Sequence, residues 1–181
     1  AVNPKQAKKF SVYVRIPNRD TSELYTPTPE VSGVKSFAVN GTAVTPKIEK
    51  GYAVVTREWK AGDKIELELP LAVQRITADE RIVPNRGRVA LRYGPLIYNV
   101  ERADQADINQ ALGDAPLKPE WKGDLLGGVV ALMGTWANGK PLVAIPNFAR
   151  MNRLGQASTD DAPENAGVTF APGASVQGAT T

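Results

Sequence analysis

The chain contains neither cysteine nor histidine. These two absences exclude disulfide bridges, thiolate nucleophiles, imidazole general bases and nearly all zinc sites. Any catalysis by this chain has to rest on Asp, Glu, Lys, Ser or Tyr side chains. Without thiols, the composition gives no indication of a redox compartment.

Long apolar runs and runs of one charge are also missing. The longest apolar stretch, "DLLGGVVALMGTW", is broken by glycines and is about half of the roughly 20 residues that span a bilayer. No signal peptide is visible. No run of basic residues is longer than the pair Lys8 and Lys9, and the net charge is only +3. The sequence therefore predicts neither a membrane nor a nucleic acid as partner.

The composition that is present suits a folded protein. The 181 residues are 42% hydrophobic and 23% charged, which is enough for one large domain or two small ones. The first residue is Ala1 rather than Met. This start suggests a processed product or an excised piece of a longer protein.

Apolar and polar residues alternate along several segments. "FSVYVRIP", "KIELELP", "RVALRY" and "LIYNV" each place apolar side chains on one face and polar side chains on the other. Such two-faced segments are typical of antiparallel sheets with one solvated face. Asn-Gly at 40–41 and at 138–139, and Gly-Asp at 62–63, mark tight turns between these segments. Only residues 101–114 have a helix-like composition, enough for a turn or two of helix.

About nine short strands with tight turns predict an all-β fold, an antiparallel β-sandwich. We expect two small sandwich or jelly-roll subdomains, at residues 1–82 and 83–154. Residues 155–181 are rich in Gly, Ala, Ser, Thr and Pro, and we expect a flexible or truncated tail there.

Two carboxylates are the first candidates for chemistry. Glu66 and Glu68 are two residues apart on one predicted strand, so both point to the same face. A pair of this kind suits acid–base cleavage of a glycosidic bond. The alternative is an ordinary solvated strand face, and we favour it. "LLGG" at 125–128 lacks the lysine of a phosphate-binding loop, and "NGT" at 40–42 is better explained by a hairpin than by glycosylation.

Tryptophan offers a second kind of candidate site. Trp121 and Trp136 could stack on sugar rings if their faces are exposed, whereas burial between sheets is the default for an aromatic residue.

The order of six segments resembles a known family. "FSVYVRIP", "VNG", "GYAVVTREWKAGDKIELELPLAVQRI", "GRVALRYGPLIYNVE", "DLLGGVVALMG" and "LVAIPNFARMNR" follow one another as in the C-terminal β-sandwich region of glycoside hydrolase family 127. The resemblance covers roughly residues 8–153 and is most specific from Gly51 to Glu101. The family includes β-L-arabinofuranosidases.

The resemblance implies that chemistry is done elsewhere. In that family an (α/α)₆ barrel precedes the sandwiches and uses a cysteine nucleophile near zinc, held by further Cys and Glu ligands. No cysteine of that set exists here, so we expect no catalytic residue and no metal ligand in this chain. We expect no cofactor either, and zinc only in the barrel. The family pattern also has a strand or more before "FSVYVRIP", which would leave an open edge. Analogy implies a bacterial protein, periplasmic or secreted.

The segment around Gly94 and Pro95 is the expected contact with that barrel. We expect Gly94 and Pro95 to let the strand cross from one sheet to another. The residues expected to dock are Arg88, Arg92, Tyr93, Gly94 and Pro95.

Three functions remain open from the sequence. The first is a non-catalytic accessory module that packs on the barrel of the same polypeptide. The second is an autonomous carbohydrate-binding module with an aromatic platform. The third is a small enzyme that uses Glu66 and Glu68.

Overall fold

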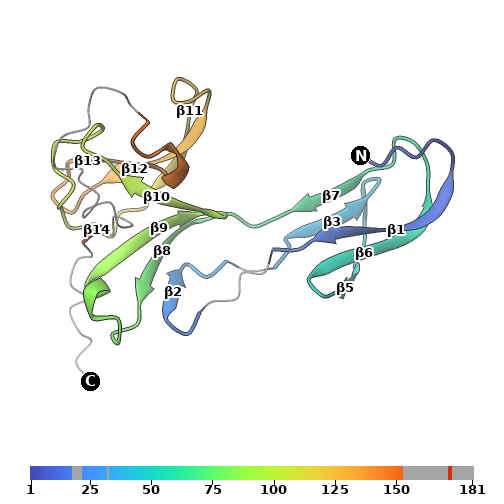
Figure 1. Ribbon diagram of the computed structural model, residues 1–181, viewed down its shortest axis with the longest axis horizontal. Helices are drawn as coiled ribbons and strands as arrows, with labels where there is room; N and C mark the ends of the chain where they lie inside the picture. The colour runs from blue at the N-terminus through green and yellow to red at the C-terminus, as the bar shows by residue number, and fades with distance from the viewer. Residues whose placement is uncertain (18–21, 32, 153–170, 173–181) are drawn as a thin grey trace. The chain divides into compact units, whose positions relative to one another are not determined.

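The computed structural model describes residues 1–17, 22–31, 33–152 and 171–172. Its described residues form strands, turns and two single-turn 3₁₀ helices, η1 (Val83–Asn85) and η2 (Asn147–Ala149). The chain divides into two compact units. Unit 1 comprises Ala1–Asp20 and Val31–Leu71, and unit 2 comprises Thr21–Glu30 and Ala72–Thr181. All strand pairings are antiparallel, so the predicted all-β class is confirmed (Figure 1).

Unit 1 is a small sandwich of two three-stranded sheets. One sheet has the order β1 (Lys8–Arg15), β6 (Tyr52–Trp59), β5 (Lys47–Glu49), and the other has the order β4 (Thr42–Ala43), β3 (Ser36–Val39), β7 (Ile65–Glu68). The core between them consists of Phe37, Val39, Ala53, Val55 and Trp59. The predicted apolar face of β1 packs on this core, and β1 is an edge strand.

The tight turns of unit 1 follow the sequence closely. The β3–β4 turn holds Asn40 and Gly41 at φ values of 51° and 74°. Positive φ at both central residues is what a type I′ hairpin requires, and Asn-Gly is the pair that tolerates it best. This predicted hairpin is therefore confirmed.

Unit 2 is built on one eight-stranded sheet. Seven strands follow the order β11 (Lys118–Lys122), β12 (Val129–Thr135), β13 (Pro141–Pro146), β10 (Leu96–Val100), β9 (Arg88–Tyr93), β8 (Val73–Ala78), β2 (Tyr25–Thr28). The eighth, β14 (Ala171–Pro172), pairs with the start of β9. Residues 101–110 contain turns and bends instead of the expected helical turn.

The unit boundary differs from the one we expected. β8 was expected in the first subdomain, but it pairs with both β9 and β2 and so belongs to unit 2. β2 lies in sequence between β1 and β3 of unit 1, and it forms the edge of the unit 2 sheet. Of the expected tail at residues 155–181, only β14 lies within the described residues.

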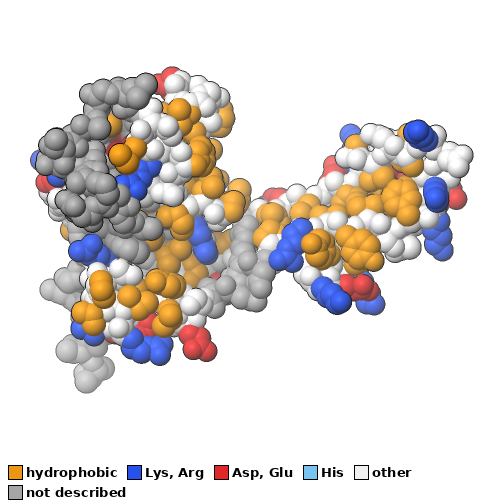
Figure 2. Space-filling model, in the orientation of Figure 1, with side chains coloured by type: hydrophobic (Ala, Val, Ile, Leu, Met, Phe, Trp, Pro, Cys, Tyr) orange, Lys and Arg blue, Asp and Glu red, His pale blue; other side chains and the backbone are white. Residues whose placement is uncertain are grey.

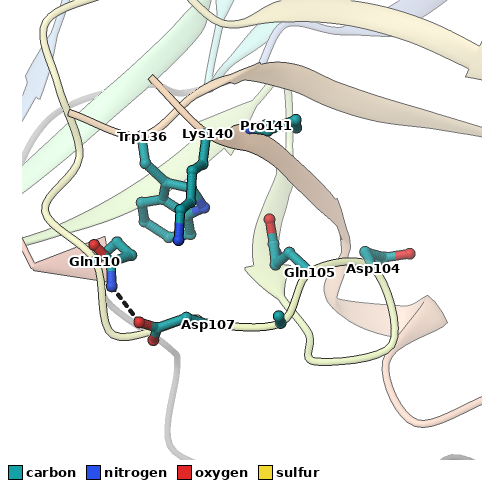
Figure 3. A pocket seen from close by; sticks show the side chains of 8 residues that line it. Asp104, Gln105, Asp107, Gln110, Trp136, Lys140 and Pro141 are labelled. Atoms are coloured by element: carbon teal, nitrogen blue, oxygen red, sulfur yellow. Dashed lines mark hydrogen bonds between the residues drawn. The ribbon is translucent and has the colours of Figure 1, made fainter. Parts of the chain in front are cut away.

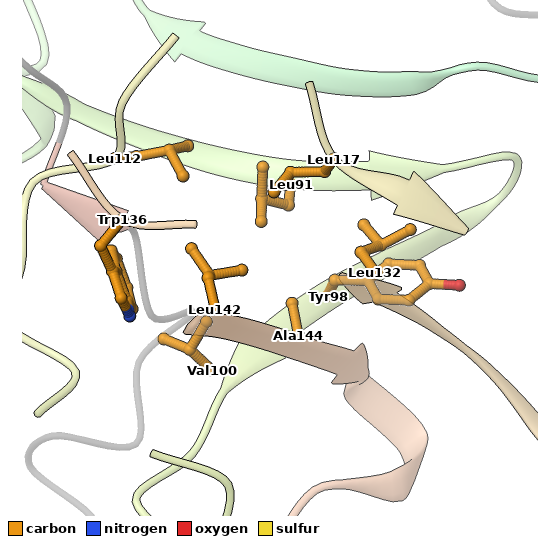
Figure 4. Close-up of a cluster of buried hydrophobic side chains, with 9 residues drawn as sticks. All are labelled: Leu91, Tyr98, Val100, Leu112, Leu117, Leu132, Trp136, Leu142 and Ala144. Atoms are coloured by element: carbon orange, nitrogen blue, oxygen red, sulfur yellow. The ribbon is translucent and has the colours of Figure 1, made fainter. Parts of the chain in front are cut away.

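The core of unit 2 lies on one face of its sheet. Leu91, Tyr98, Val100, Leu132, Leu142 and Ala144 come from four neighbouring strands, and Trp136 closes the cluster (Figure 4). Leu112 and Leu117, from the segment between β10 and β11, cover them. A smaller cluster of Ala131, Ile145 and Ala149 lies apart from this core. The connection between β10 and β11 is therefore held in place by burial of its leucines.

Candidate functional site

Arg92 is part of a hydrogen-bonded chain inside unit 2. Its Nε donates a 2.9 Å hydrogen bond to Oε1 of Gln74, its cross-strand neighbour on β8. Nε2 of Gln74 donates to the Pro29 carbonyl at 2.8 Å, and Gln74 is only 2% exposed. Arg92 thus helps tie β9 and β8 to the segment that follows β2.

Gly94 and Pro95 form a hairpin turn, which corrects our expectation of a sheet-to-sheet crossing. Tyr93 and Leu96 pair directly across this turn, so β9 and β10 are neighbours in one sheet. Gly94 has φ 57°, and Pro95 follows in the second central position. A tight two-residue hairpin favours glycine at such a position because glycine has no Cβ to clash.

The five expected docking residues do not form one compact patch. Tyr93 packs on the core, Arg92 is half-buried, and Arg88 and Pro95 are exposed. Arg88 and Pro95 stand seven residues apart at opposite ends of β9, which is roughly 23 Å along a strand. Arg88 and Pro95 are therefore the two exposed members of the set, and they are not neighbours.

Four apolar side chains elsewhere in unit 2 are exposed, and of these only Trp121 was a candidate site residue from the sequence. Phe148 on η2, Met151 just after it, Leu126 and Trp121 are all exposed. Leu125 and Ala149, the chain neighbours of Leu126 and Phe148, both pack in the small second cluster. Figure 2 shows hydrophobic side chains at the surface among Lys and Arg.

Glu66 and Glu68 each take part in a structural contact. The Gly41 amide donates to Oε2 of Glu66 at 3.1 Å, which ties β7 to the β3–β4 turn. Lys35 donates to Oε1 of Glu68 at 2.5 Å, and this bond lowers the pKa of the Glu68 carboxyl. A catalytic acid needs a raised pKa, whereas the pKa of Glu68 is lowered, so Glu68 is not suited to act as a general acid.

The tryptophans fall into two classes. Trp59 is fully buried, and its Nε1 donates to the Phe10 carbonyl at 3.0 Å. Trp136 is 2% exposed and belongs to the unit 2 core, so its ring faces are not free to stack on a sugar. Trp121, on the edge strand β11, is 65% exposed.

The Trp121 ring lies close to two glycines of the neighbouring chain segment. A Cβ built on Gly128 would lie 2.0 Å from Cζ2 of Trp121, and one on Gly123 would lie 3.4 Å from its Nε1. Because both positions are glycine, the indole can lie directly against the chain. The other face of the ring is available to a partner.

A pocket of about 210 Å³ lies beside Trp136 (Figure 3). Its polar lining comes from two segments that are distant in sequence. Asp107 and Gln110 precede Leu112, and Lys140 follows the Asn138-Gly139 turn. The sequence reasoning missed this site, although "WANGKP" was identified as a turn, because no local pattern shows which loop packs against it.

Hydrogen bonds fix the loop that carries Asp107. The Asn109 amide donates to Oδ1 of Asp107 at 2.9 Å, and Gln110 donates to Oδ2. These two bonds hold the pKa of the Asp107 carboxyl below its ordinary value, and Arg102 and Lys140 add a smaller effect in the same direction. Asp107 is therefore a carboxylate at neutral pH.

The zinc and cysteine chemistry implied by the resemblance has no ligands in this chain. The sequence lacks Cys and His altogether, so neither the thiolate nucleophile nor a thiolate ligand can be placed. Within the described ranges, no group of three or more Asp or Glu side chains is arranged to hold a metal ion. A helix long and apolar enough to cross a bilayer is likewise not found in the described part of the chain.

Two family models match consecutive parts of the chain. Residues 1–71 match the β-L-arabinofuranosidase GH127 middle domain, and residues 73–159 match the glycoside hydrolase family 127 C-terminal domain. The junction between the two matches coincides with the junction between units 1 and 2 after Leu71.

Similar proteins agree with this match. A non-reducing end β-L-arabinofuranosidase from Bifidobacterium longum is 34% identical over 105 residues, which is 54% of this chain and 16% of that protein. A GH127 β-L-arabinofuranosidase from Geobacillus stearothermophilus T6 superposes with a TM-score of 0.66 at 29% identity, over 83% of this chain and 26% of the other. A further GH127 β-arabinofuranosidase superposes with a TM-score of 0.67 at 24% identity, over 81% of this chain and 26% of the other, which shows a shared fold. The chain thus spans about a quarter or less of the length of these relatives, and it belongs to glycoside hydrolase family 127, of which it carries the middle and C-terminal domains.

Proposed function

We propose that this chain is a non-catalytic β-sandwich module that packs on the (α/α)₆ catalytic barrel of the same polypeptide in a β-L-arabinofuranosidase-like enzyme. The observation that carries the proposal is the extent of the match. The chain corresponds to only 26% of each of the two solved relatives, and that part comprises the middle and C-terminal domains. Most of each relative therefore lies outside the matched region, with room for a separate catalytic domain.

The carboxylates support a structural role. Glu66 bonds the Gly41 amide, and Glu68 bonds Lys35 and Ser36, so both anchor unit 1 strands and turns. A retaining glycosidase needs two facing carboxyl groups about 5 Å apart across the scissile bond, one of them with a raised pKa. The lowered pKa of Glu68 runs against that requirement.

The surface of unit 2 supports a contact with another domain. Trp121, Leu126, Phe148 and Met151 are exposed apolar side chains, and we propose that they belong to one contiguous patch, the kind of surface that marks an interaction site. We assign these four residues, together with Arg88 and Pro95, as contacts of the catalytic barrel. Aromatic residues and Met are enriched at such interfaces.

An activity assay tests the non-catalytic part of the proposal. The purified 181-residue chain and the complete gene product are each incubated with an aryl β-L-arabinofuranoside, and release of the aryl group is measured. We expect turnover only by the complete gene product. Turnover by the isolated chain that is lost in both Glu66→Gln and Glu68→Gln, but retained in Glu58→Gln, would show that the chain is an enzyme by itself.

Carbohydrate binding through Trp121 is a second candidate function. It is favoured by a specific observation, namely an indole that is 65% exposed and seated on Gly128. Sugar rings stack their C–H faces on such aromatic surfaces. Affinity electrophoresis in arabinan-containing gels tests it: retardation of the wild-type chain that disappears in Trp121→Ala and persists in Phe148→Ala supports a binding module, and equal mobility of all three excludes it.

A further inference from the structure

The basic residues of unit 1 gather at one end of the unit, where residues 1–10 lie against residues 57–64. These two segments contain six basic residues and two acidic ones: Lys5, Lys8, Lys9, Arg57, Lys60 and Lys64, with Glu58 and Asp63. The whole chain has 22 basic and 19 acidic residues, which leaves 16 basic and 17 acidic residues elsewhere. This basic end therefore has a net charge of +4 and accounts for the positive charge of the chain. Figure 2 shows Lys and Arg side chains there, on the right of the view.

Backbone contacts fix the N-terminal segment at the basic end. The Val2 amide donates to the Asp63 carbonyl at 2.7 Å, and the Gly62 amide donates to Oδ1 of Asn3 at 2.8 Å. Both contacts join the start of the chain to the turn between β6 and β7. The segment with three of the six cations is therefore held beside the turn, residues 60–64, that carries two more.

The pairing of β1 with β6 brings further charges together. Lys8 lies opposite Trp59, and Lys9 lies opposite Glu58. Opposite residues of an antiparallel pair have Cα atoms roughly 5 Å apart, so Lys8 starts close to Lys60, the residue after Trp59. Glu58 offsets part of the charge of Lys9. The two basic segments, distant in sequence, thus form one continuous surface in the fold.

The five lysines of the basic end are exposed and are not neutralised by ion pairs. Among the residues that the structure describes, the ion-paired lysines of unit 1 are Lys35 and Lys47, which lie outside the two segments. The carboxylate of Asp63 instead accepts hydrogen bonds from the Lys60 backbone amide and the Asn40 side chain, each at 2.9 Å. The lysine ammonium groups therefore remain available to an anionic partner.

Arg57 has a more fixed position than the lysines. Its guanidinium carbon lies 5.3 Å from the centre of the Trp59 ring, and its Nε donates to the Glu58 carbonyl at 3.2 Å. Its charge adds to that of the lysines, because charges within about a Debye length, roughly 8 Å at physiological salt, act together on a ligand.

The composition of the basic end favours a flexible polyanion over a folded partner. Protein interfaces are enriched in aromatic residues, Met and Arg and are depleted in Lys. The aromatic residues of the two segments are Phe10, which is half-buried, and Trp59, which is fully buried. Exposed rings that could stack on the bases of a single-stranded nucleic acid are therefore missing from these two segments. A polysaccharide with a carboxylate on each sugar needs only spaced cations, and it suits a chain from a glycoside hydrolase family.

We propose that the basic end of unit 1 binds an acidic polysaccharide that carries carboxylates on successive sugars. One exposed ion pair contributes little, but several pairs on one polymer act together, so binding is multivalent and falls with salt. This site differs from the Trp121 surface, where a sugar would stack on an indole. The inference does not depend on the proposed accessory role, because all six cations belong to unit 1.

A matched pair of polymers tests the chemistry of the ligand. Polygalacturonate and its fully methyl-esterified form share one backbone and differ in charge. Binding of each to the 181-residue chain and to the complete gene product is measured by isothermal titration calorimetry. We expect polygalacturonate alone to bind both proteins, with an affinity that falls roughly tenfold between about 50 mM and about 300 mM NaCl. Equal binding of the methyl ester would overturn the proposal.

A matched pair of double variants tests the place of binding. Lys60→Gln with Lys64→Gln removes two charges from the basic end, and Lys50→Gln with Lys118→Gln removes two exposed charges elsewhere. We expect the first double variant to weaken polygalacturonate binding about tenfold and the second to leave it within about twofold of the wild type. Equal losses would show that only net charge matters and would overturn the proposal.

Other polyanions and the complete gene product provide the remaining controls. If a short DNA duplex, or vesicles that contain phosphatidylserine, bind more tightly than polygalacturonate and depend on Lys60 and Lys64, the partner is of another class and the proposal fails. If none of the polyanions binds at about 50 mM NaCl, the basic end is a solvated surface and the proposal fails. If the 181-residue chain binds polygalacturonate and the complete gene product does not, another domain covers the basic end and the proposal also fails.

Discussion

Nε1 of Trp59 donates a 3.0 Å hydrogen bond to the backbone carbonyl of Phe10, and the two rings lie 6.2 Å apart between their centroids. This contact joins the last residue of β6 to β1, the edge strand of its sheet. Trp59 is also the largest fully buried side chain of unit 1. Trp59 therefore fills apolar volume in the core of unit 1 and also forms a hydrogen bond between two strands of that unit.

Replacing Trp59 should destabilise unit 1. Trp59→Phe removes ring volume and leaves the Phe10 carbonyl without its partner, for an expected loss of about 2 kcal/mol in the free energy of unfolding. Trp121→Phe is the matched control, and we expect a change within about 0.5 kcal/mol because that ring is exposed. Urea unfolding followed by circular dichroism measures both, and equal losses would contradict the assigned role of Trp59.

The hydrogen bonds from Arg92 to Gln74 and from Gln74 to Pro29 predict that substitutions at two arginines of β9 lower the free energy of unfolding by different amounts. Arg92→Met leaves Oε1 of the buried Gln74 without its donor, so we expect a loss of about 2 kcal/mol. Arg88→Met on the same strand changes only an exposed side chain and should cost less than about 0.5 kcal/mol. Hydrogen exchange should also speed up in β2 for Arg92→Met alone. Unchanged exchange there would show that the chain does not hold β2.

Acid should remove a stabilising contribution of Asp63. The Lys60 amide and the Asn40 side chain donate to its carboxylate at 2.9 Å each and lower the pKa of Asp63. Because the folded pKa lies below the unfolded value of about 3.9, the contribution is fully present above that value and is lost as the pH falls through the folded pKa.

Comparison with Asp63→Asn isolates this effect from other carboxylates. The difference in urea midpoint between wild type and Asp63→Asn should stay constant from about pH 7 to pH 5 and shrink below about pH 4. A difference that persists unchanged to pH 2 would mean that the charge on Asp63 contributes nothing.

Gly128 and Trp121 should be energetically coupled. In the wild type, Gly128→Ala places a methyl group 2.0 Å from the Trp121 ring and strains a backbone with φ 118°. In a Trp121→Ala background only the backbone strain remains, so the cost of Gly128→Ala should fall by about 1 kcal/mol. Gly127→Ala, with φ 77° and open space at its Cβ, should cost the same in both backgrounds. A zero coupling energy for Gly128 would show that the indole does not rest on this residue.

The sequence allowed much of the fold to be predicted because its signals are local. Alternation at Phe10, Val12 and Val14 placed the core face of β1, and Asn40-Gly41 placed a hairpin. The placement of β2 could not be predicted in this way. The segment "YTPT" shows no alternation of apolar and polar residues. Its partner strand β8 lies about fifty residues later in the chain, where Thr28 pairs with Arg75 and Tyr25 pairs with Ala78. The hairpin at Gly94 was missed because the same two residues suit both a turn and a crossing.

The candidate site was less predictable than the fold. Burial of Trp136 and exposure of Trp121 depend on which strands and loops cover each ring, and those neighbours are distant in the sequence. The pocket arises because the segment after β10 folds back on the Trp136 turn, where the Ala137 amide donates to the Ala111 carbonyl at 2.9 Å. That is a long-range contact between two irregular segments, and no periodic pattern of apolar residues in the sequence predicts it.

Radical footprinting of the proposed docking surface tests the central claim most directly. Trp121, Phe148 and Met151 are exposed in this chain, and Trp and Met side chains oxidise readily. Hydroxyl-radical labelling read by mass spectrometry is compared between the 181-residue chain and the complete gene product, with buried Trp59 as the low-labelling reference. The account predicts at least a severalfold drop in labelling of these three residues in the complete gene product, and equal labelling in the two samples would contradict it.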